Sequence, residues 1–303
     1  MNILHYLLQS YVVVALLAIG LGLSFPFLGN AFAPYTTLFL QIIFFLSSLK
    51  IDSRHVAREL KSAPSIAIAA LYMLIIFPAL TFGAAKLFHL DSSVALLLLA
   101  AMPAGMTSPL LAEIIGGSVS FALIITVVTS LLAPFTVPIV IKALAGSEVV
   151  VPLLSMIGSL LLVIILPFIL AQLTRHFFEK QIKPFLSFTK PFSIFLLGLL
   201  ITSVISQQSG ALLGNPGQFV EVLAVLAVFF IATHAVGYWG IPWLNREQRL
   251  ASLVCLAYMN FTLAIYLAAT YFPSPSILIP VVLSVFPWAL GIIPLQTMLK
   301  RRK

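Results

Sequence analysis

The sequence predicts an all-helical membrane protein with ten transmembrane helices, and three observations support this fold class. Of the 303 residues, 61% are hydrophobic and only 8% are charged, against roughly 25% charged residues in an average soluble domain. The mean hydropathy is +1.16. The apolar residues form long runs without the period-two alternation of a transmembrane β-barrel. A soluble enzyme, a disordered chain and a disulfide-stapled domain are therefore excluded, because each needs a more polar composition or more cysteines than this chain has.

Ten apolar runs lie close to the roughly 20 residues that a helix needs to cross the hydrocarbon core. The first run is interpreted as a retained span and not as a cleaved signal peptide. No Lys or Arg precedes it, and Pro34 would directly follow the candidate cleavage motif Ala31-Phe32-Ala33. The expected spans are 8–28, 34–50, 64–87, 93–115, 119–142, 151–173, 186–206, 218–241, 250–272 and 276–299.

The basic residues predict the orientation of these spans. All but two of the 16 Lys and Arg residues fall after spans two, six and eight or at the C-terminus, and only Lys86 and Lys142 fall on the opposite side. The positive-inside rule then places both termini in the cytoplasm. We expect a multi-pass protein of the plasma membrane, which in a bacterium is the inner membrane. The net charge of +8 reflects these short loops, so no nucleic-acid partner is expected.

Ten spans divide into two halves of five, residues 1–149 and residues 150–303. Because five is odd, the second half would enter the membrane inverted relative to the first. Polar residues at corresponding places favour such a repeat: Thr107 in span four and Asn260 in span nine lie about half the chain length apart. The sequence thus predicts two inverted five-helix repeats.

The polar cluster in span four lies among residues that break helices. Pro103, Gly105 and Pro109 fall within seven residues, and proline removes a helical hydrogen bond. An interrupted helix persists in a bilayer only where protein or a wet cavity satisfies the freed backbone. Asn260 in span nine also needs a polar partner, although no proline accompanies it. We therefore expect helices four and nine to be broken and to cross, which brings helix ends, carbonyls and hydroxyls together.

Three segments carry a family resemblance: residues 102–108 (Met-Pro-Ala-Gly-Met-Thr-Ser), residues 126–138 and residues 260–264. In this order and spacing they resemble the bile acid/sodium symporter family of ten-span transporters. The resemblance implies a core domain of spans three to five and eight to ten, a panel domain of spans one, two, six and seven, and a substrate cavity between them. It also implies alternating access, a small organic anion as substrate, no organic cofactor, and sodium as the coupling ion.

Several residues depart from the family pattern of sodium ligands. Cys255 falls on the position of an acidic residue, Met259 and Met73 fall on or near glutamines, and Pro109 falls on an asparagine. Hard cations prefer oxygen ligands to sulfur, so the implied sodium site is partly degraded. Its candidate ligands are Ser108, Thr126 and Asn260. Symport with sodium remains the leading hypothesis, and a proton-coupled or uncoupled carrier or exporter of organic anions remains the alternative.

Two ionisable residues are candidates for proton coupling. Glu113 follows the break in span four, and His234 lies within span eight; intramembrane ionisable residues are frequently functional. The alternative interpretation is a solvated acid at a helix end for Glu113, and a packing hydrogen bond for His234. The full set of candidate substrate-binding and ion-binding residues is Gly105, Thr107, Ser108, Thr126, Thr129, Ser130, Asn260 and Thr262.

Other classes of function find little support. The chain has no HExxH or GxSxG motif and no pair of intramembrane aspartates, so an intramembrane enzyme is not expected. No ring of acidic residues indicates a channel. Trp239, Trp243 and Trp288 are expected at the membrane interfaces. A small organic anion and membrane lipid are the expected partners, while the substrate, the direction of transport and the oligomeric state are left open.

Overall fold

The computed structural model describes residues 11–52, 63–214, 216–288 and 290–291, and the regular structure in these ranges is helical apart from one isolated bridge. The expectation of an all-helical fold is confirmed for them. Five helical stretches are long and apolar enough to cross a membrane. They are Pro26–Ser48, Pro64–Leu87, Val119–Ala145, Leu153–Gln207 and Phe219–Trp239.

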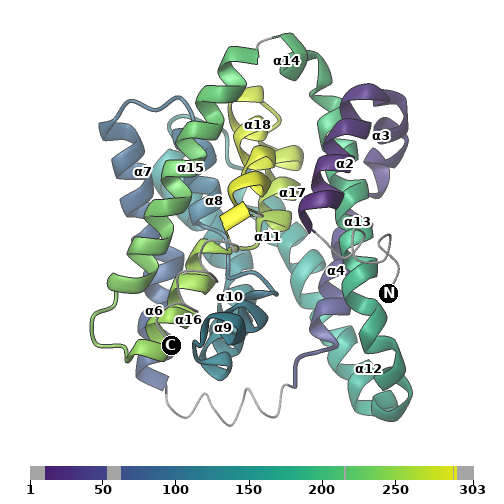
Figure 1. Cartoon of the computed structure of the whole chain (residues 1–303), viewed down its shortest axis with the longest axis vertical. Coiled ribbons are helices and arrows are strands. Elements are labelled where there is room, and N and C mark those ends of the chain that lie inside the picture. The colour runs from purple at the N-terminus through teal and green to yellow at the C-terminus, as the bar shows by residue number, and fades with distance from the viewer. Residues whose placement is uncertain (1–10, 53–62, 215, 289, 292–303) are drawn as a thin grey trace.

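One group of helices, which we call the outer bundle, lies on one side of the molecule (Figure 1). Its helices are α2 (Tyr11–Ser24), α3 (Pro26–Phe32), α4 (Thr36–Ser48), α12 (Leu166–Ile182) and α13 (Leu186–Gln207). Helix α13 packs along α2, α3 and α4, while α12 packs on α4. Short 3₁₀ segments join two pairs of these helices: Ala33–Tyr35 joins α3 to α4, and Lys183–Phe185 joins α12 to α13.

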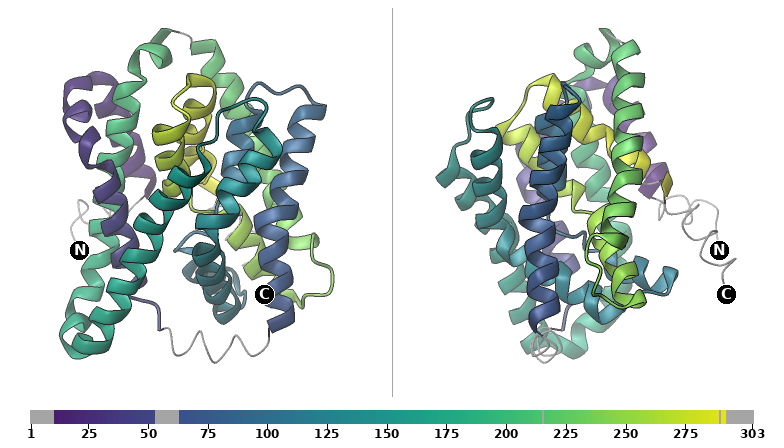
Figure 2. Two further views of the ribbon diagram at one scale, coloured as in Figure 1. Left: turned by 180° about the vertical axis from the view of Figure 1, so that it is seen from behind. Right: turned by 90° about the vertical axis from the view of Figure 1, so that its left-hand side faces the viewer.

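A second group, the crossing bundle, lies beside the outer bundle in Figure 1 and in the left-hand view of Figure 2. Its helices are α6 (Ala63–Leu71), α7 (Phe77–Leu87), α8 (Ser93–Ala100), α9 (Ser108–Ile115), α10 (Val119–Ala145), α15 (Pro216–Trp239), α16 (Arg246–Ala257), α17 (Phe261–Tyr271) and α18 (Pro275–Leu283). Helix α11 (Leu153–Leu160) packs on α10 and leads into the outer bundle. The short α14 (Ser209–Gly214) returns the chain from α13 to α15.

The helix bounds follow the expected apolar runs closely in the middle of the chain. The run 93–115 corresponds to α8 and α9, 119–142 to α10, and 186–206 to α13. Helix α12 continues beyond the expected end of span six at residue 173, as far as Ile182, with a charged final turn. The run 276–299 begins in α18, and its residues 292–299 lie outside the described ranges. The division into inverted repeats at residue 149 stays a prediction.

Two helices widen into one π-helical turn each, Tyr72–Ile76 before α7 and Leu161–Ile165 before α12. Both turns end directly before a proline at the second position of the next helix, Pro78 and Pro167. A proline ring clashes with the carbonyl of the residue four positions earlier. A π-turn shifts that carbonyl and allows the helix to continue across the proline.

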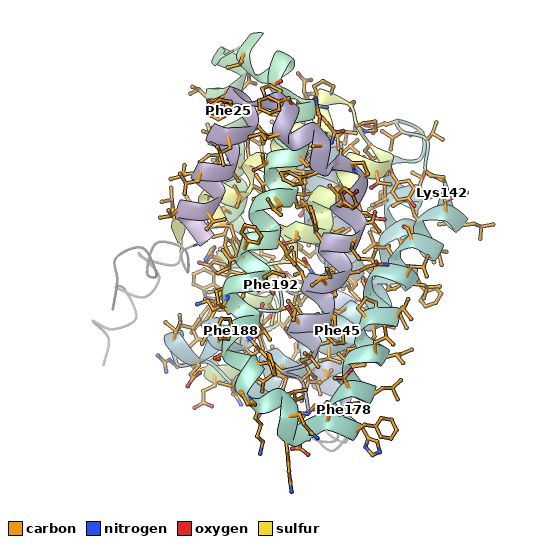
Figure 3. All side chains as sticks on the ribbon, turned by 90° about the vertical axis from the view of Figure 1, so that its right-hand side faces the viewer. Phe25, Phe45, Lys142, Phe178, Phe188 and Phe192 are labelled. Carbon is orange, nitrogen blue, oxygen red and sulfur yellow. The ribbon has the colours of Figure 1, made fainter. Side chains whose placement is uncertain are left out.

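The structure describes both basic residues that the sequence pattern places on the sparsely charged side, Lys86 and Lys142. In Figure 3, Lys142 lies in the upper part of the molecule, whereas Phe178, near the end of α12, lies at the bottom. Lys86 is on the Lys142 side in that pattern, and its Nζ pairs with Glu148 at 2.7 Å. The Lys86 charge on this side is therefore partly neutralised by Glu148.

Candidate functional site

Two helix interruptions meet inside the crossing bundle. Helix α8 ends at Ala100 and α9 begins at Ser108, while α16 ends at Ala257 and α17 begins at Phe261. The extended residues between them form an antiparallel bridge, Ala104 with Met259. The Gly105 amide donates to the Tyr258 carbonyl at 3.0 Å, and the Asn260 amide donates to the Pro103 carbonyl at 2.8 Å. Each interruption thereby satisfies backbone groups that the other leaves free.

The two breaks have different local causes. Prolines at 103 and 109 flank the first break, and each removes a backbone donor. The second break has no proline; instead, the Asn260 Oδ1 accepts the Leu263 amide at 3.1 Å and caps the start of α17. Asparagine is among the best N-cap residues. The break in span nine therefore depends on its cap and on hydrogen bonds from the first break.

Thr129 on α10 supports the crossing from behind. Its Oγ1 accepts the Ala104 amide at 3.2 Å and donates to the Ile125 carbonyl at 2.7 Å. The side chain is fully buried. The Thr129 hydroxyl therefore gives the Ala104 amide, which lies outside a helix, a hydrogen-bond acceptor, and it holds α10 against the crossing.

We expect Thr129→Val to destabilise the protein by about 1–3 kcal/mol, because it leaves the buried Ala104 amide without an acceptor. The measurement is the thermal unfolding midpoint of the purified protein in detergent. Thr136→Val is the matched control, since Thr136 on the same helix is exposed and only bonds its own turn through the Leu132 carbonyl. An equal loss in both variants would contradict the role assigned to Thr129.

A buried cluster of two hydroxyls and one thiol lies where α9, α10 and α16 meet. The Ser108 and Thr126 side chains lie next to the Cys255 thiol. The Cys255 Sγ and the Thr126 Oγ1 both point to the Ala122 carbonyl, at 3.8 Å and 2.8 Å. The Ser108 Oγ is fully buried and has no hydrogen-bond partner among the described residues. This cluster offers neutral oxygens to a cation but no negative charge.

The donor set fits sodium only in part. Hydroxyls and unwound carbonyls are sodium ligands in transporters, and the buried Ser108 Oγ beside Cys255 provides one such oxygen. Cys255, however, places sulfur where a hard cation prefers oxygen. No group of three or more His, Cys, Asp or Glu side chains occurs anywhere in the described ranges. A sodium ion at this cluster would therefore be held by neutral groups alone, and binding would be weak.

A small cavity of about 70 Å³ lies between the crossing and the outer bundle. All of its described lining residues are uncharged. The outer bundle contributes Ile43, Phe44, Ser47, Ser193 and Leu197, and the crossing contributes Gly105, Met106, Thr107, Met259, Asn260, Phe261, Thr262 and Trp288. An apolar wall with a few polar groups is typical of the lining of small-molecule sites. The first turn of α17 and the residue before α9 border this cavity.

The predicted site residues fall into two layers. Gly105, Thr107, Asn260 and Thr262 line the cavity. Behind them, buried in the protein, are Ser108, Thr126, Thr129 and Ser130. The Ser130 Oγ also has no hydrogen-bond partner within the described ranges.

The two proton-coupling candidates lie outside this cavity. Glu113 is exposed near the end of α9. The His234 Nδ1 lies 2.7 Å from the Phe230 carbonyl, and its ring packs edge-on against Phe230 and Tyr258. His234 thus contacts the crossing through the Tyr258 side chain.

Sequence reasoning missed part of the cavity wall. Ser47 and Ser193 come from spans two and seven and were not among the predicted site residues. The expectation that Trp288 anchors the protein at an interface is wrong, because Trp288 lines the cavity and packs on Phe261 with ring centroids 4.6 Å apart. Trp239 and Trp243 are largely exposed, as anchoring residues would be. Phe261, the aromatic residue that directly follows the second break, could have indicated this wall.

Comparison with known proteins agrees with this architecture. The chain is similar to the "Uncharacterized sodium-dependent transporter YocS" of Bacillus subtilis (strain 168), with 27% identity over 135 residues. This alignment covers 44% of the chain and 42% of the relative, so it spans less than half of either protein. A family model described as "Sodium Bile acid symporter family" matches residues 37–215, which is more than half of the chain and includes the first break. The chain therefore belongs to the sodium bile acid symporter family.

Proposed function

We propose that this protein is a secondary-active transporter that carries a small organic anion across the plasma membrane, with sodium as the coupling ion. The observation that carries the proposal is the crossing of two interrupted helices beside an uncharged cavity between two helix bundles. Family membership supports a transporter rather than an enzyme. The Bacillus relative is named as a sodium-dependent transporter, and we extend sodium dependence to this chain as part of the proposal.

The chemistry of the cavity favours an anionic substrate with an apolar body. Helix N-termini carry partial positive charge and unpaired amides. The start of α17 and the residue preceding α9 line the cavity, where a carboxylate would meet them. Ile43, Phe44 and Leu197 on the opposite wall would hold the carbon skeleton. An uncharged site with two helix N-termini attracts an anion without fixing it through a salt bridge, which suits a carrier that must also release it.

The position of the cavity supports alternating access. Its wall consists of residues from both bundles, so a movement of the crossing bundle against the outer bundle would open it first to one side and then to the other. Sodium at the Ser108 and Thr126 hydroxyls would lie behind the crossing and add positive charge near the anion. The predominance of Lys and Arg after spans two, six and eight and at the C-terminus supports a cytoplasmic location for those loops and for both termini.

The test of the proposal is uptake into proteoliposomes. A thermal-shift screen of organic anions, with sodium and with choline in its place, first identifies a ligand that stabilises the protein. Uptake of that ligand is expected to require an inward sodium gradient and to fall to background in choline. Uptake that is unchanged in choline removes sodium from the mechanism, and a dependence on pH instead favours proton coupling through Glu113 or His234.

Asn260→Asp tests the anionic nature of the substrate. Aspartate is as good an N-cap as asparagine, so the fold and the break in span nine are expected to persist. Its negative charge in the cavity repels an anion, and we expect at least a tenfold weaker affinity for the ligand by thermal shift. Asn260→Ser, an uncharged residue with the same capping ability, is the control. Undiminished binding in the aspartate variant would contradict the assignment of the cavity to anions.

A further inference from the structure

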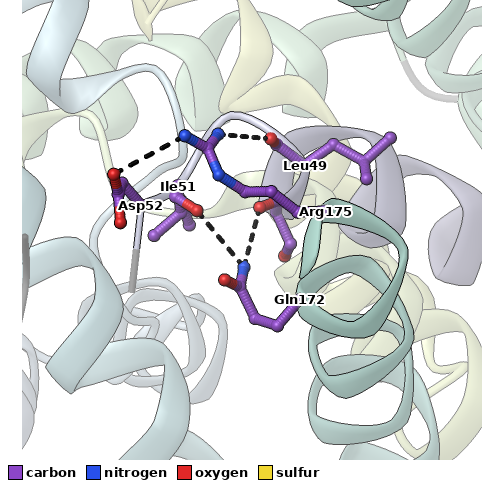
Figure 4. Close-up of polar contacts among 6 residues, drawn as sticks. Leu49, Ile51, Asp52, Gln172 and Arg175 are labelled. Atoms are coloured by element: carbon purple, nitrogen blue, oxygen red, sulfur yellow. Dashed lines mark hydrogen bonds and ion pairs between the residues drawn. The ribbon is translucent and has the colours of Figure 1, made fainter. Parts of the chain in front are cut away.

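The C-terminal end of α4 is held by side chains from α12 (Figure 4). The Gln172 Nε2 donates to the Ser48 carbonyl at 3.1 Å and to the Ile51 carbonyl at 3.4 Å. The Arg175 Nη1 donates to the Leu49 carbonyl at 3.1 Å, and its Nη2 lies 3.7 Å from a carboxylate oxygen of Asp52. We call these two side chains, Gln172 and Arg175, the α4 clamp.

The clamp performs a specific backbone task. The last carbonyls of a helix have no partner within the helix. At the end of α4, the carbonyls of Ser48, Leu49 and Ile51 accept hydrogen bonds from side chains of α12. Gln172 and Arg175 lie three residues apart, which places them on one face of α12. Both side chains are half-buried, and the donors from Arg175 carry charge, so these bonds are stronger than neutral ones.

The clamp lies at the point where the chain leaves the outer bundle. Helix α4 is the last outer-bundle helix before the chain passes to the crossing bundle, whose first described helix, α6, begins at Ala63. Residues 49–52 follow α4 and are held by the clamp. If one bundle moves against the other, the connection must pull on a fixed point of the outer bundle. The clamp supplies such a point without contacting the cavity.

We propose that Gln172 and Arg175 are positioning residues that set the rate of the conformational change during transport. By holding residues 48–52 on α12, they keep the outer-bundle end of the connection in place while the crossing bundle moves. The inference rests on the proposed function, because it assigns a role in the transport cycle. It predicts an effect on the maximum rate that leaves substrate binding unchanged.

The outer bundle offers a matched control. The Gln41 Nε2, also in α4, donates to the Leu162 carbonyl at 3.2 Å in the π-turn before α12. Gln41 therefore joins the same two parts of the chain by the same chemistry, but far from the end of α4. Gln41→Leu removes one interhelical bond without loosening the connection between the bundles.

The experiment compares Gln172→Leu/Arg175→Gln, Arg175→Lys and Gln41→Leu in proteoliposome uptake, with ligand affinity and unfolding midpoint measured on each purified protein. We expect the double variant to lower the maximum rate at least fivefold and to keep the half-saturating ligand concentration within twofold. Arg175→Lys, which retains a charged donor for the Leu49 carbonyl, is expected to keep more than half of the rate, and Gln41→Leu to keep nearly all of it.

The outcomes separate the two proposals. Wild-type protein without uptake of any stabilising anion overturns the proposed function itself. Wild-type transport combined with an unchanged rate in the double variant overturns only the role of the clamp. The same holds if Gln41→Leu slows transport as much as the double variant, or if ligand affinity falls in parallel with the rate. Faster hydrogen exchange of residues 45–52 in the double variant alone would be independent support.

Discussion

Gly105→Ala is expected to lower transport at least tenfold while the protein still inserts into the membrane. A Cβ atom at this position would lie 2.4 Å from the Tyr258 carbonyl oxygen and 3.3 Å from the Met259 carbonyl oxygen. Both are backbone atoms, so no side chain can turn away to make room. The Gly105 amide donates to the same Tyr258 carbonyl, and the methyl group must therefore push the two interruptions apart.

The consequence goes beyond one hydrogen bond. Separation at Gly105 also strains the bond between the Asn260 amide and the Pro103 carbonyl, and buried backbone groups without partners are costly in a membrane. The cavity would change shape as well, because Gly105 and Asn260 both line it. We expect a loss of ligand-induced stabilisation together with the loss of uptake.

Gly83→Ala and Gly158→Ala are the matched controls for this prediction. Both glycines lie in helices, in α7 and α11, and a Cβ at either position would meet no atom within 4 Å. Alanine has a higher helix propensity than glycine, so both variants are expected to transport normally and to be at least as stable. Wild-type transport by Gly105→Ala would show that the close approach at the crossing is not required.

The helices themselves were largely predictable because apolar runs and their polar borders are local signals. The run 93–115 was predicted to the residue, and Pro103, Gly105 and Pro109 indicated the break within it. Helix α12 was predicted too short, since its charged last turn leaves the apolar run but continues the helix. Asn260 was identified from its polarity alone, and its capping role became clear only from the contact with the Leu263 amide.

The relations between distant segments were not predictable in the same way. Ser47 and Ser193 reach the cavity from two spans whose sequences contain no local sign of a site. Arg175 was interpreted only as a loop charge that reports orientation, whereas it also binds the end of α4 more than 120 residues earlier. Such contacts depend on which helix faces pack together, and a single sequence does not specify that packing.

Cys255→Asp is expected to lower the sodium concentration for half-maximal uptake at least tenfold. The Cys255 thiol is fully buried beside the Ser108 and Thr126 hydroxyls, and Ser108 begins α9, whose N-terminus carries partial positive charge. A carboxylate there would face two hydroxyl oxygens and add the negative charge that the cluster lacks. At about 4 Å, opposite unit charges attract by about 4 kcal/mol at an effective dielectric constant of 20. Even after the cost of burying the carboxylate, a tenfold effect needs only about 1.4 kcal/mol.

Cys255→Asn separates charge from shape in this prediction, because asparagine has the size of aspartate and adds an oxygen without a negative charge. It is expected to keep the sodium dependence of the wild type within about threefold. The aspartate variant should also gain thermal stability on addition of sodium but not of choline, which is a binding signal that does not require transport. Unchanged sodium titrations in both uptake and stability would place the coupling ion elsewhere, since a carboxylate facing Ser108 and Thr126 cannot leave a cation at those oxygens unaffected.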